Sequence, residues 1–137
     1  MKRIPTMLEV VAVALVDRDG RVLLQQRCAK RQHGGLWEFP GGKLEAGETA
    51  VFALIREIEE ELGITLAVDE LAWLDQAADP VNGLVIALYT CRRWAGEPRC
   101  LDAAAIGWFT LQEIAALPLP PLDRPLAEAL EQWLRDG

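Results

Sequence analysis

Residues 42–64 read GKLEAGETAVFALIREIEEELGI, and this stretch holds the densest local signals in the chain. Thr49 is a preferred helix N-cap residue, and Gly63 suits the left-handed conformation that ends many helices. Between them, apolar residues recur at helical spacing and form one stripe: Val51, Leu54, Ile55, Ile58 and Leu62. The sequence therefore predicts an amphipathic helix from Thr49 through Leu62 with one buried face.

Three glutamates in the last turns of this helix call for a physical explanation. Glu57, Glu60 and Glu61 stand at i, i+3 and i+4, so they share one face and repel each other. The helix dipole disfavours negative charge at this end, and each penalty is about 0.3–1 kcal/mol. A divalent cation would relieve the repulsion, and carboxylate oxygens suit Mg²⁺ or Mn²⁺. A solvated acidic face is the alternative for the glutamates taken alone.

The residues around the glutamates favour the cation. Gly41, Gly42 and Gly47 frame the loop that enters the helix, so backbone can approach a ligand closely. Arg56 adjoins Glu57 and can hold it by a charge-assisted hydrogen bond. The helix and its loop together are therefore a candidate site for a metal-assisted reaction.

The rest of the chain alternates apolar runs with turn signals. Residues 10–16 are apolar on both alternating faces, which predicts a central strand, and residues 21–27 follow a turn as its expected hairpin partner. Residues 28–48 read as a long functional loop. Further elements are expected downstream: strands at 65–77, 84–94 and 106–109, a turn at 79–83, and a helix at 123–135. This order predicts an α/β (α+β) fold with a mixed β-sheet between α-helices.

Composition narrows the function classes. A chain of 137 residues suits one domain, 1–137, and the net charge of −7 argues against a nucleic-acid polymer as partner. Small phosphorylated ligands remain possible if cations lie between the charges. Lys2 and Arg3 precede an apolar run as in a signal peptide, but Glu9 and the acidic turn after that run favour a buried strand. Without a stretch of ~20 apolar residues or a CxxC pair, we expect a cytoplasmic protein with reduced cysteines and no membrane partner.

The helix and its loop resemble the Nudix hydrolase superfamily. The Nudix box is Gly, five residues, Glu, seven residues, then Arg-Glu-apolar-x-Glu-Glu-x-Gly-apolar. All nine fixed positions match at the right spacing within 42–64: Gly42, Glu48, Arg56, Glu57, Ile58, Glu60, Glu61, Gly63 and Ile64. The upstream run LWEFPGGK, residues 36–43, is similar to the MutT-like branch, which acts on nucleoside triphosphates. The resemblance implies a Nudix fold with the box helix on one face of a mixed sheet.

The resemblance also assigns roles at the matching positions. It implies Mg²⁺ or Mn²⁺ on Glu57, Glu60, Glu61 and the Gly41 carbonyl, with Glu57 as candidate general base, Arg56 orienting it and Glu60 beside them in the catalytic set. Arg27 matches an arginine that contacts substrate phosphate, and Lys43 and Phe39 are further substrate-binding candidates. Some relatives carry an extra glutamate ligand in a late loop, where Asp102 stands here, one methylene shorter. Asp123 matches a base-contacting polar residue, although Asp is also a preferred N-cap.

The implied reaction is attack by water at the β-phosphorus of a nucleoside triphosphate, giving nucleoside monophosphate and pyrophosphate. An oxidised nucleotide such as 8-oxo-dGTP and a (d)CTP-type nucleotide are both candidate substrates. Two alternatives stay open: an ADP-ribose or nucleotide-sugar pyrophosphatase, and a non-catalytic nucleotide-recognition module. A monomer and a homodimer both agree with the sequence. Trp73, Trp94, Trp108 and Trp133 are predicted to pack in the core, and His33 receives no catalytic role.

Overall fold

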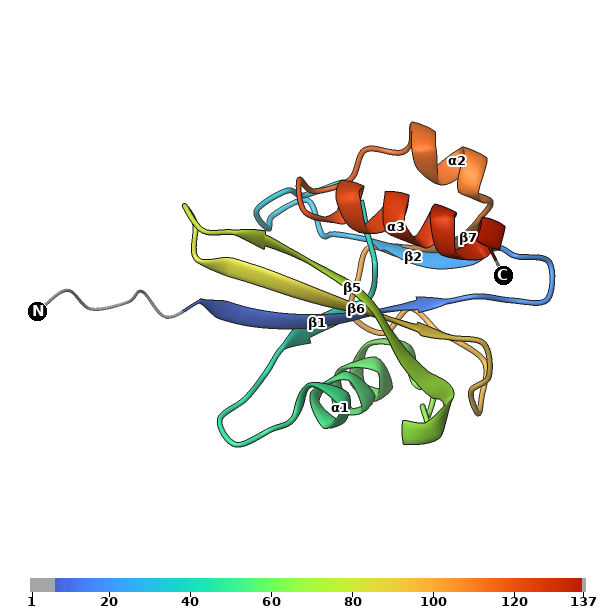
Figure 1. Ribbon diagram of the computed structural model, residues 1–137, viewed down its shortest axis with the longest axis horizontal. Helices are drawn as coiled ribbons and strands as arrows, with labels where there is room; N and C mark the ends of the chain where they lie inside the picture. The colour runs from blue at the N-terminus through green and yellow to red at the C-terminus, as the bar shows by residue number, and fades with distance from the viewer. Residues whose placement is uncertain (1–6, 137) are drawn as a thin grey trace, which may run out of the picture.

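The computed structural model describes residues 7–136 (Figure 1). In chain order the strands and helices are β1 (Leu8–Leu15), β2 (Val22–Gln26), β3 (Trp37–Glu38), β4 (Gly41–Lys43), α1 (Ala50–Leu62), the 3₁₀ helix η1 (Val68–Glu70), β5 (Leu71–Asp79), β6 (Leu84–Cys91), β7 (Ala105–Phe109), α2 (Leu111–Ala116) and α3 (Asp123–Asp136). The strands form a four-stranded sheet in the order β4-β1-β6-β5 and a three-stranded sheet in the order β3-β2-β7.

Strand β1 is the centre of the four-stranded sheet, as its sequence predicts. It pairs antiparallel with β4 and parallel with β6, so the sheet is mixed. All residues from 11 to 16 are buried. Alternate side chains enter two different cores: Val11 and Val13 pack with α1, whereas Ala12 and Ala14 pack with α3. An apolar residue at every position is required because both faces of the strand are covered.

Helix α1 forms where the sequence predicts it. The Thr49 hydroxyl accepts the Phe52 N–H at 3.3 Å, and Gly63 adopts a left-handed φ of 69° while its N–H bonds to the Glu59 carbonyl. Leu54, Ile58 and Leu62 are fully buried, which confirms the predicted stripe along its centre. Val51 and Ile55 are only half-buried at its margins.

Helices α2 and α3 lie on the opposite side of the four-stranded sheet from α1 (Figure 1). Helix α3 begins at Asp123 as expected, but α2 is absent from the sequence-based prediction. Its signal is a capping box: the Thr110 side chain accepts the Glu113 N–H, and the Glu113 side chain accepts the Thr110 N–H. Such a box satisfies two free N–H groups at a helix start, and it stabilises a helix too short for a periodic pattern.

Three other predictions of secondary structure are wrong in detail. Strand β2 is not the hairpin partner of β1, because the two share only one bridge, Val16 to Val22, and then enter separate sheets. The expected loop at 28–48 contains β3 and β4, whose partners lie far away in sequence. The expected strand at 65–77 is a single bridge at Thr65, then η1, with β5 starting only at Leu71. In each case long-range pairing, rather than local pattern, decides the outcome.

The prediction for the tryptophans holds for three of the four. Trp94 and Trp108 stack at 5.9 Å against the α1 core, and Trp133 packs against the α3 core. Trp73 is 56% exposed, so its predicted burial is wrong. It lies on β5, the outer strand of its sheet, whereas α1 packs over β1 and β4.

The apolar run near the N-terminus was expected to be a buried strand rather than part of a signal peptide. The apolar run forms the buried strand β1, whereas Lys2 and Arg3 lie outside the described residues. Within residues 7–136, no helix has both the length and the apolar character needed to span a membrane. All three cysteines are free thiols, as expected.

Candidate active site

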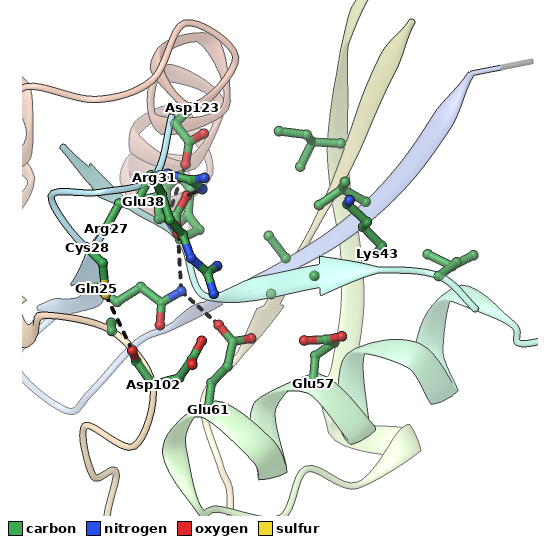
Figure 2. Close-up of a pocket in the computed structure, with 18 of the residues that line it drawn as sticks. Gln25, Arg27, Cys28, Arg31, Glu38, Lys43, Glu57, Glu61, Asp102 and Asp123 are labelled. Carbon is green, nitrogen blue, oxygen red and sulfur yellow. Dashed lines mark hydrogen bonds and ion pairs between the residues drawn. The ribbon is translucent and has the colours of Figure 1, made fainter. Parts of the chain in front are cut away.

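A cavity of about 630 Å³ opens between the two sheets and α1. Strands β1 and β6 contribute apolar side chains to it, Val10, Ala12 and Ile86. Polar groups come from β2 and the loop after it, the β3–β4 segment and the loop after it, α1, the loop before β7, and the start of α3. Figure 2 shows their side chains converging on one space from elements that are far apart in the sequence.

The box glutamates do not all lie in the same environment. Glu57 and Glu61, one helical turn apart, line the cavity, whereas Glu60 is not among the described residues that line it. The Glu60 side chain is 61% exposed and that of Glu57 is 19% exposed. The face predicted to carry all three glutamates is therefore divided by the edge of the cavity.

Gly42 explains how the Glu57 carboxylate reaches the cavity wall. A Cβ at residue 42 would overlap the carboxylate carbon and both oxygens of Glu57. Strand β4 brings this glycine over the helix, because Gly42 pairs with Val11 of the central strand. A glycine here thus provides space for a carboxylate rather than a special backbone angle.

Arg56 connects the glutamates of the box. Its Nε and Nη2 each donate to Glu48 at 2.8 Å, and its Nη1 donates to Glu57 at 2.9 Å and to Glu60 at 3.5 Å. The predicted Arg56–Glu57 hydrogen bond is confirmed, and the two-pronged contact with Glu48 adds to it. That contact lowers the pKa of Glu48 to about 2, since both donors favour the ionised carboxylate. Arg56 is thereby fixed against the loop and holds Glu57 in a single orientation.

Glu61 is a buried acid. Only 7% of the residue is exposed. Burial raises its pKa to about 8, and the negative charges of Glu57, Glu38 and Asp102 add to that rise. One hydrogen bond opposes it, from the Gln25 amide to Glu61 Oε1 at 2.8 Å. Glu61 Oε2 is buried and has no hydrogen-bond partner.

The donors at this place fit a hard divalent cation. Within residues 7–136, no three acidic, histidine or cysteine side chains already converge as a metal's ligands would. Two carboxylates nevertheless line one wall of the cavity, and one of them has a buried oxygen without a donor. An oxygen-only set of this kind suits Mg²⁺ or Mn²⁺. Gly41, whose carbonyl the family resemblance nominated, also lines the cavity.

Three cationic side chains line the cavity: Arg27, Arg31 and Lys43. Arg27 is held by Glu38 at 2.7 Å and by the Gln32 carbonyl at 2.8 Å. Neither Arg31 nor Lys43 has an ion-pair partner within residues 7–136. Arg31 was not among the candidates, because it lies in a loop without periodicity and outside the recognised motif. These cations can offset part of the charge of a bound phosphate.

Asp123 lies at the opposite end of the cavity from α1. It is 6% exposed, and its Oδ2 accepts the Phe39 backbone N–H at 3.1 Å. Burial raises the pKa of Asp123 to about 7, and the negative charge of Glu38 contributes, whereas the Phe39 N–H and Arg27 lower it. The Asp123 side chain therefore connects the start of α3 to the segment before β4 by a hydrogen bond. The Phe39 side chain is buried in the α3 core beside it.

Asp102 and Gln25 complete the polar lining. Asp102 belongs to the loop before β7, and its negative charge acts on Glu61. Gln25 is not among the site residues predicted from the sequence, although its position in β2 indicates that its side chain is buried. It follows Leu23 by two residues in β2, so it points to the same face as a core side chain.

Comparisons with known proteins agree with this geometry. The chain matches the NUDIX domain family over residues 6–130. It is 42% identical over 125 residues to the CTP pyrophosphohydrolase of Escherichia coli strain K12, and the aligned region covers 90% of each chain. It is 38% identical over 119 residues to the putative 8-oxo-dGTP diphosphatase 2 of Mycobacterium tuberculosis, which covers 85% of this chain and 83% of the relative.

Solved structures give the same result. The solution structure of the E. coli ORF135 protein superimposes with a TM-score of 0.81 at 35% identity, covering 93% of this chain and 90% of that one. A MutT structure from a study of Aliivibrio salmonicida and Vibrio cholerae also gives 0.81, at 28% identity, with 93% and 99% covered. The chain belongs to the NUDIX domain family and is a Nudix hydrolase of the MutT-like type.

Proposed function

We propose that this enzyme hydrolyses a nucleoside triphosphate to the monophosphate and pyrophosphate, with a cytosine nucleotide as its preferred substrate. The observation that carries the proposal is the layout of the cavity. A buried hydrogen-bond acceptor, Asp123, lines one end of the cavity, and the carboxylates of Glu57 and Glu61 line the other (Figure 2). Arg31 and Lys43 line the same cavity and have no ion-pair partner among the described residues. A base at the first end would extend its phosphates toward the second.

The phosphate end would carry the reaction. Glu57 would take the proton of the attacking water, and Arg56 would keep its carboxylate in place through the 2.9 Å hydrogen bond. Attack at the β-phosphorus would break its bond to the oxygen that bridges to the α-phosphorus, so nucleoside monophosphate would leave. When bound by Glu57, Glu60, Glu61 and the Gly41 carbonyl, Mg²⁺ or Mn²⁺ would offset the phosphate charge and polarise the phosphorus–oxygen bonds.

The base end would select the nucleotide. Asp123 already accepts the Phe39 N–H through Oδ2, which leaves Oδ1 of the ionised carboxylate, the form present above a pKa of about 7, to accept from a base. Cytosine presents its amino group as a donor, and the guanine edge presents two donors, whereas thymine presents only N3–H. The relative at 42% identity is named a CTP pyrophosphohydrolase, so cytosine is placed first. The walls formed by Val10, Ala12 and Ile86 would contact the base faces.

A second candidate is 8-oxo-dGTP, because a relative at 38% identity is named for that substrate. Its N1–H and N2–H₂ edge would suit the same acceptor. An ADP-ribose complex is known for a neighbour of 21% identity, but a likeness at that level concerns the fold alone.

The test is a nucleotide panel with Mg²⁺ and with Mn²⁺: CTP, dCTP, dGTP, 8-oxo-dGTP, dTTP and ADP-ribose. We expect CTP and dCTP to have the highest kcat/KM and to yield monophosphate plus pyrophosphate. Asp123→Asn should change the ranking of bases by about 1–3 kcal/mol, as when a buried polar partner is lost. Full activity in excess EDTA, or direct release of inorganic phosphate, would contradict the mechanism, and an unchanged ranking would remove Asp123 from base recognition.

A further inference from the structure

Gln25 occupies a position in the cavity that the Nudix box does not account for. It lies on β2, is 5% exposed, and its amide stands between two carboxylates (Figure 2). The amide nitrogen donates to Glu61 Oε1 at 2.8 Å and to Glu38 Oε2 at 3.3 Å. An ionised carboxylate only accepts hydrogen bonds, so with both neighbours ionised the NH₂ and not the carbonyl faces them, as in the structure.

This orientation leaves two buried acceptors unsatisfied. Gln25 Oε1 and Glu61 Oε2 are the buried side-chain polar atoms without a partner in the part of the chain that the structure describes. Buried polar atoms without partners are rare, and they often indicate an absent ion or water. Here the two atoms belong to residues that are hydrogen-bonded to each other and line one cavity. A cation with its hydration shell would satisfy both.

We propose that Gln25 is a positioning residue for the metal site, an inference that rests on the proposed function. Its NH₂ group holds Oε1 of Glu61, which fixes the rotation of the carboxylate and leaves Oε2 as the oxygen for the cation. Its own Oε1 accepts from water that the cation retains, since Mg²⁺ keeps several waters when it binds protein. Partners of this kind orient metal ligands, and their loss commonly costs roughly 10–100-fold in metal affinity.

The contacts also link Glu61 to an arginine that lines the cavity. Gln25 bonds to Glu38, and Glu38 bonds to Arg27 at 2.7 Å. Removal of the Gln25 amide would therefore act first on Glu61 and secondarily on the arginine nominated for phosphate. Metal affinity should consequently change more than the affinity for nucleotide.

The experiment measures Mn²⁺ binding to the whole protein without nucleotide, by titration calorimetry or by the paramagnetic signal of free Mn²⁺. Gln25→Met keeps the length of the side chain and removes both polar groups, and we expect about a tenfold weaker Kd. Gln26→Met is the matched control. Gln26 is adjacent in β2 and donates to the Gly35 carbonyl at 3.1 Å, so its loss should leave the Kd within about twofold.

A double-variant comparison separates positioning from simple damage. If Gln25 acts through Glu61, Gln25→Met should have little further effect on Mn²⁺ binding in a Glu61→Gln background. Circular dichroism in EDTA should show a folded protein, and Gln25→Thr, which suits a strand, serves if the methionine variant unfolds. Equal Mn²⁺ affinity of wild type and the Gln25 variant would overturn the inference. Absence of Mn²⁺ binding by the wild type would overturn the proposed metal site, and this inference with it.

Discussion

Substitution of Asp123 by asparagine should make the stability of the protein less dependent on pH. Asp123 is almost fully buried, and its pKa in the folded state is raised from 3.8 to about 7. The folded state therefore holds a proton on this group that the unfolded state has lost, throughout the range between the two values. Stability falls as pH rises across that range, because folding must then remove a charged carboxylate from water.

The size of the effect follows from the two pKa values. A pKa raised from 3.8 to about 7 corresponds to about 4 kcal/mol of lost stability once the pH is well above 7. At pH 5 the loss is about 2 kcal/mol, and at pH 8 it is about 4 kcal/mol. Asparagine is uncharged at every pH, and its carbonyl oxygen can still accept the Phe39 N–H. The free-energy difference between variant and wild type should thus rise by about 2–3 kcal/mol from pH 5 to pH 8.

Urea unfolding followed by tryptophan fluorescence, at pH 5, 6, 7 and 8 in EDTA, measures this difference. EDTA keeps metal binding at the glutamates from contributing. Asp69→Asn removes an exposed carboxylate that does not line the cavity, so it reports the effect of one unit of net charge. Parallel stability curves for wild type and Asp123→Asn would refute the assignment of a raised pKa to this group.

Three further predictions concern the reaction and its scaffold. Glu61→Gln should lower kcat by at least about 10²-fold without lowering the melting temperature in EDTA, since a ligand charge is lost while the side-chain volume is kept. A decrease in kcat below tenfold would contradict the role of Glu61 as a metal ligand. Gly42→Ala should reduce activity with little loss of stability, because its methyl group displaces only the flexible end of Glu57. Gly41→Ala should lower the stability more, because its methyl group meets the Val11 backbone. Thermal melts and initial rates should therefore rank the two variants in opposite order. Hydrolysis in ¹⁸O water should place the label on pyrophosphate, and label on the monophosphate would show attack at the α-phosphorus.

Local chemistry was enough to predict several elements from the sequence. A hydroxyl at Thr49, a glycine at residue 63 and apolar side chains at helical spacing define α1 without reference to the rest of the chain. The unbroken apolar run of β1 indicates a strand covered on both faces, and the structure has one. The contacts of Arg56 with Glu57 and Glu60 were also predictable, because these residues lie within about one turn of the same helix.

Other features depend on contacts between distant segments, which no local pattern contains. The division into two sheets follows from the long-range pairs of β1 with β6 and of β2 with β7. The same arrangement exposes Trp73 on an outer strand and separates Glu60 from the cavity. Gln25 meets Glu61 across 36 residues of sequence, and Asp123 meets Phe39 across 84. The sequence by itself determined the helix and the type of chemistry, whereas the tertiary structure decided which acids are buried, since burial is a property of the packed chain and not of a residue's neighbours in sequence.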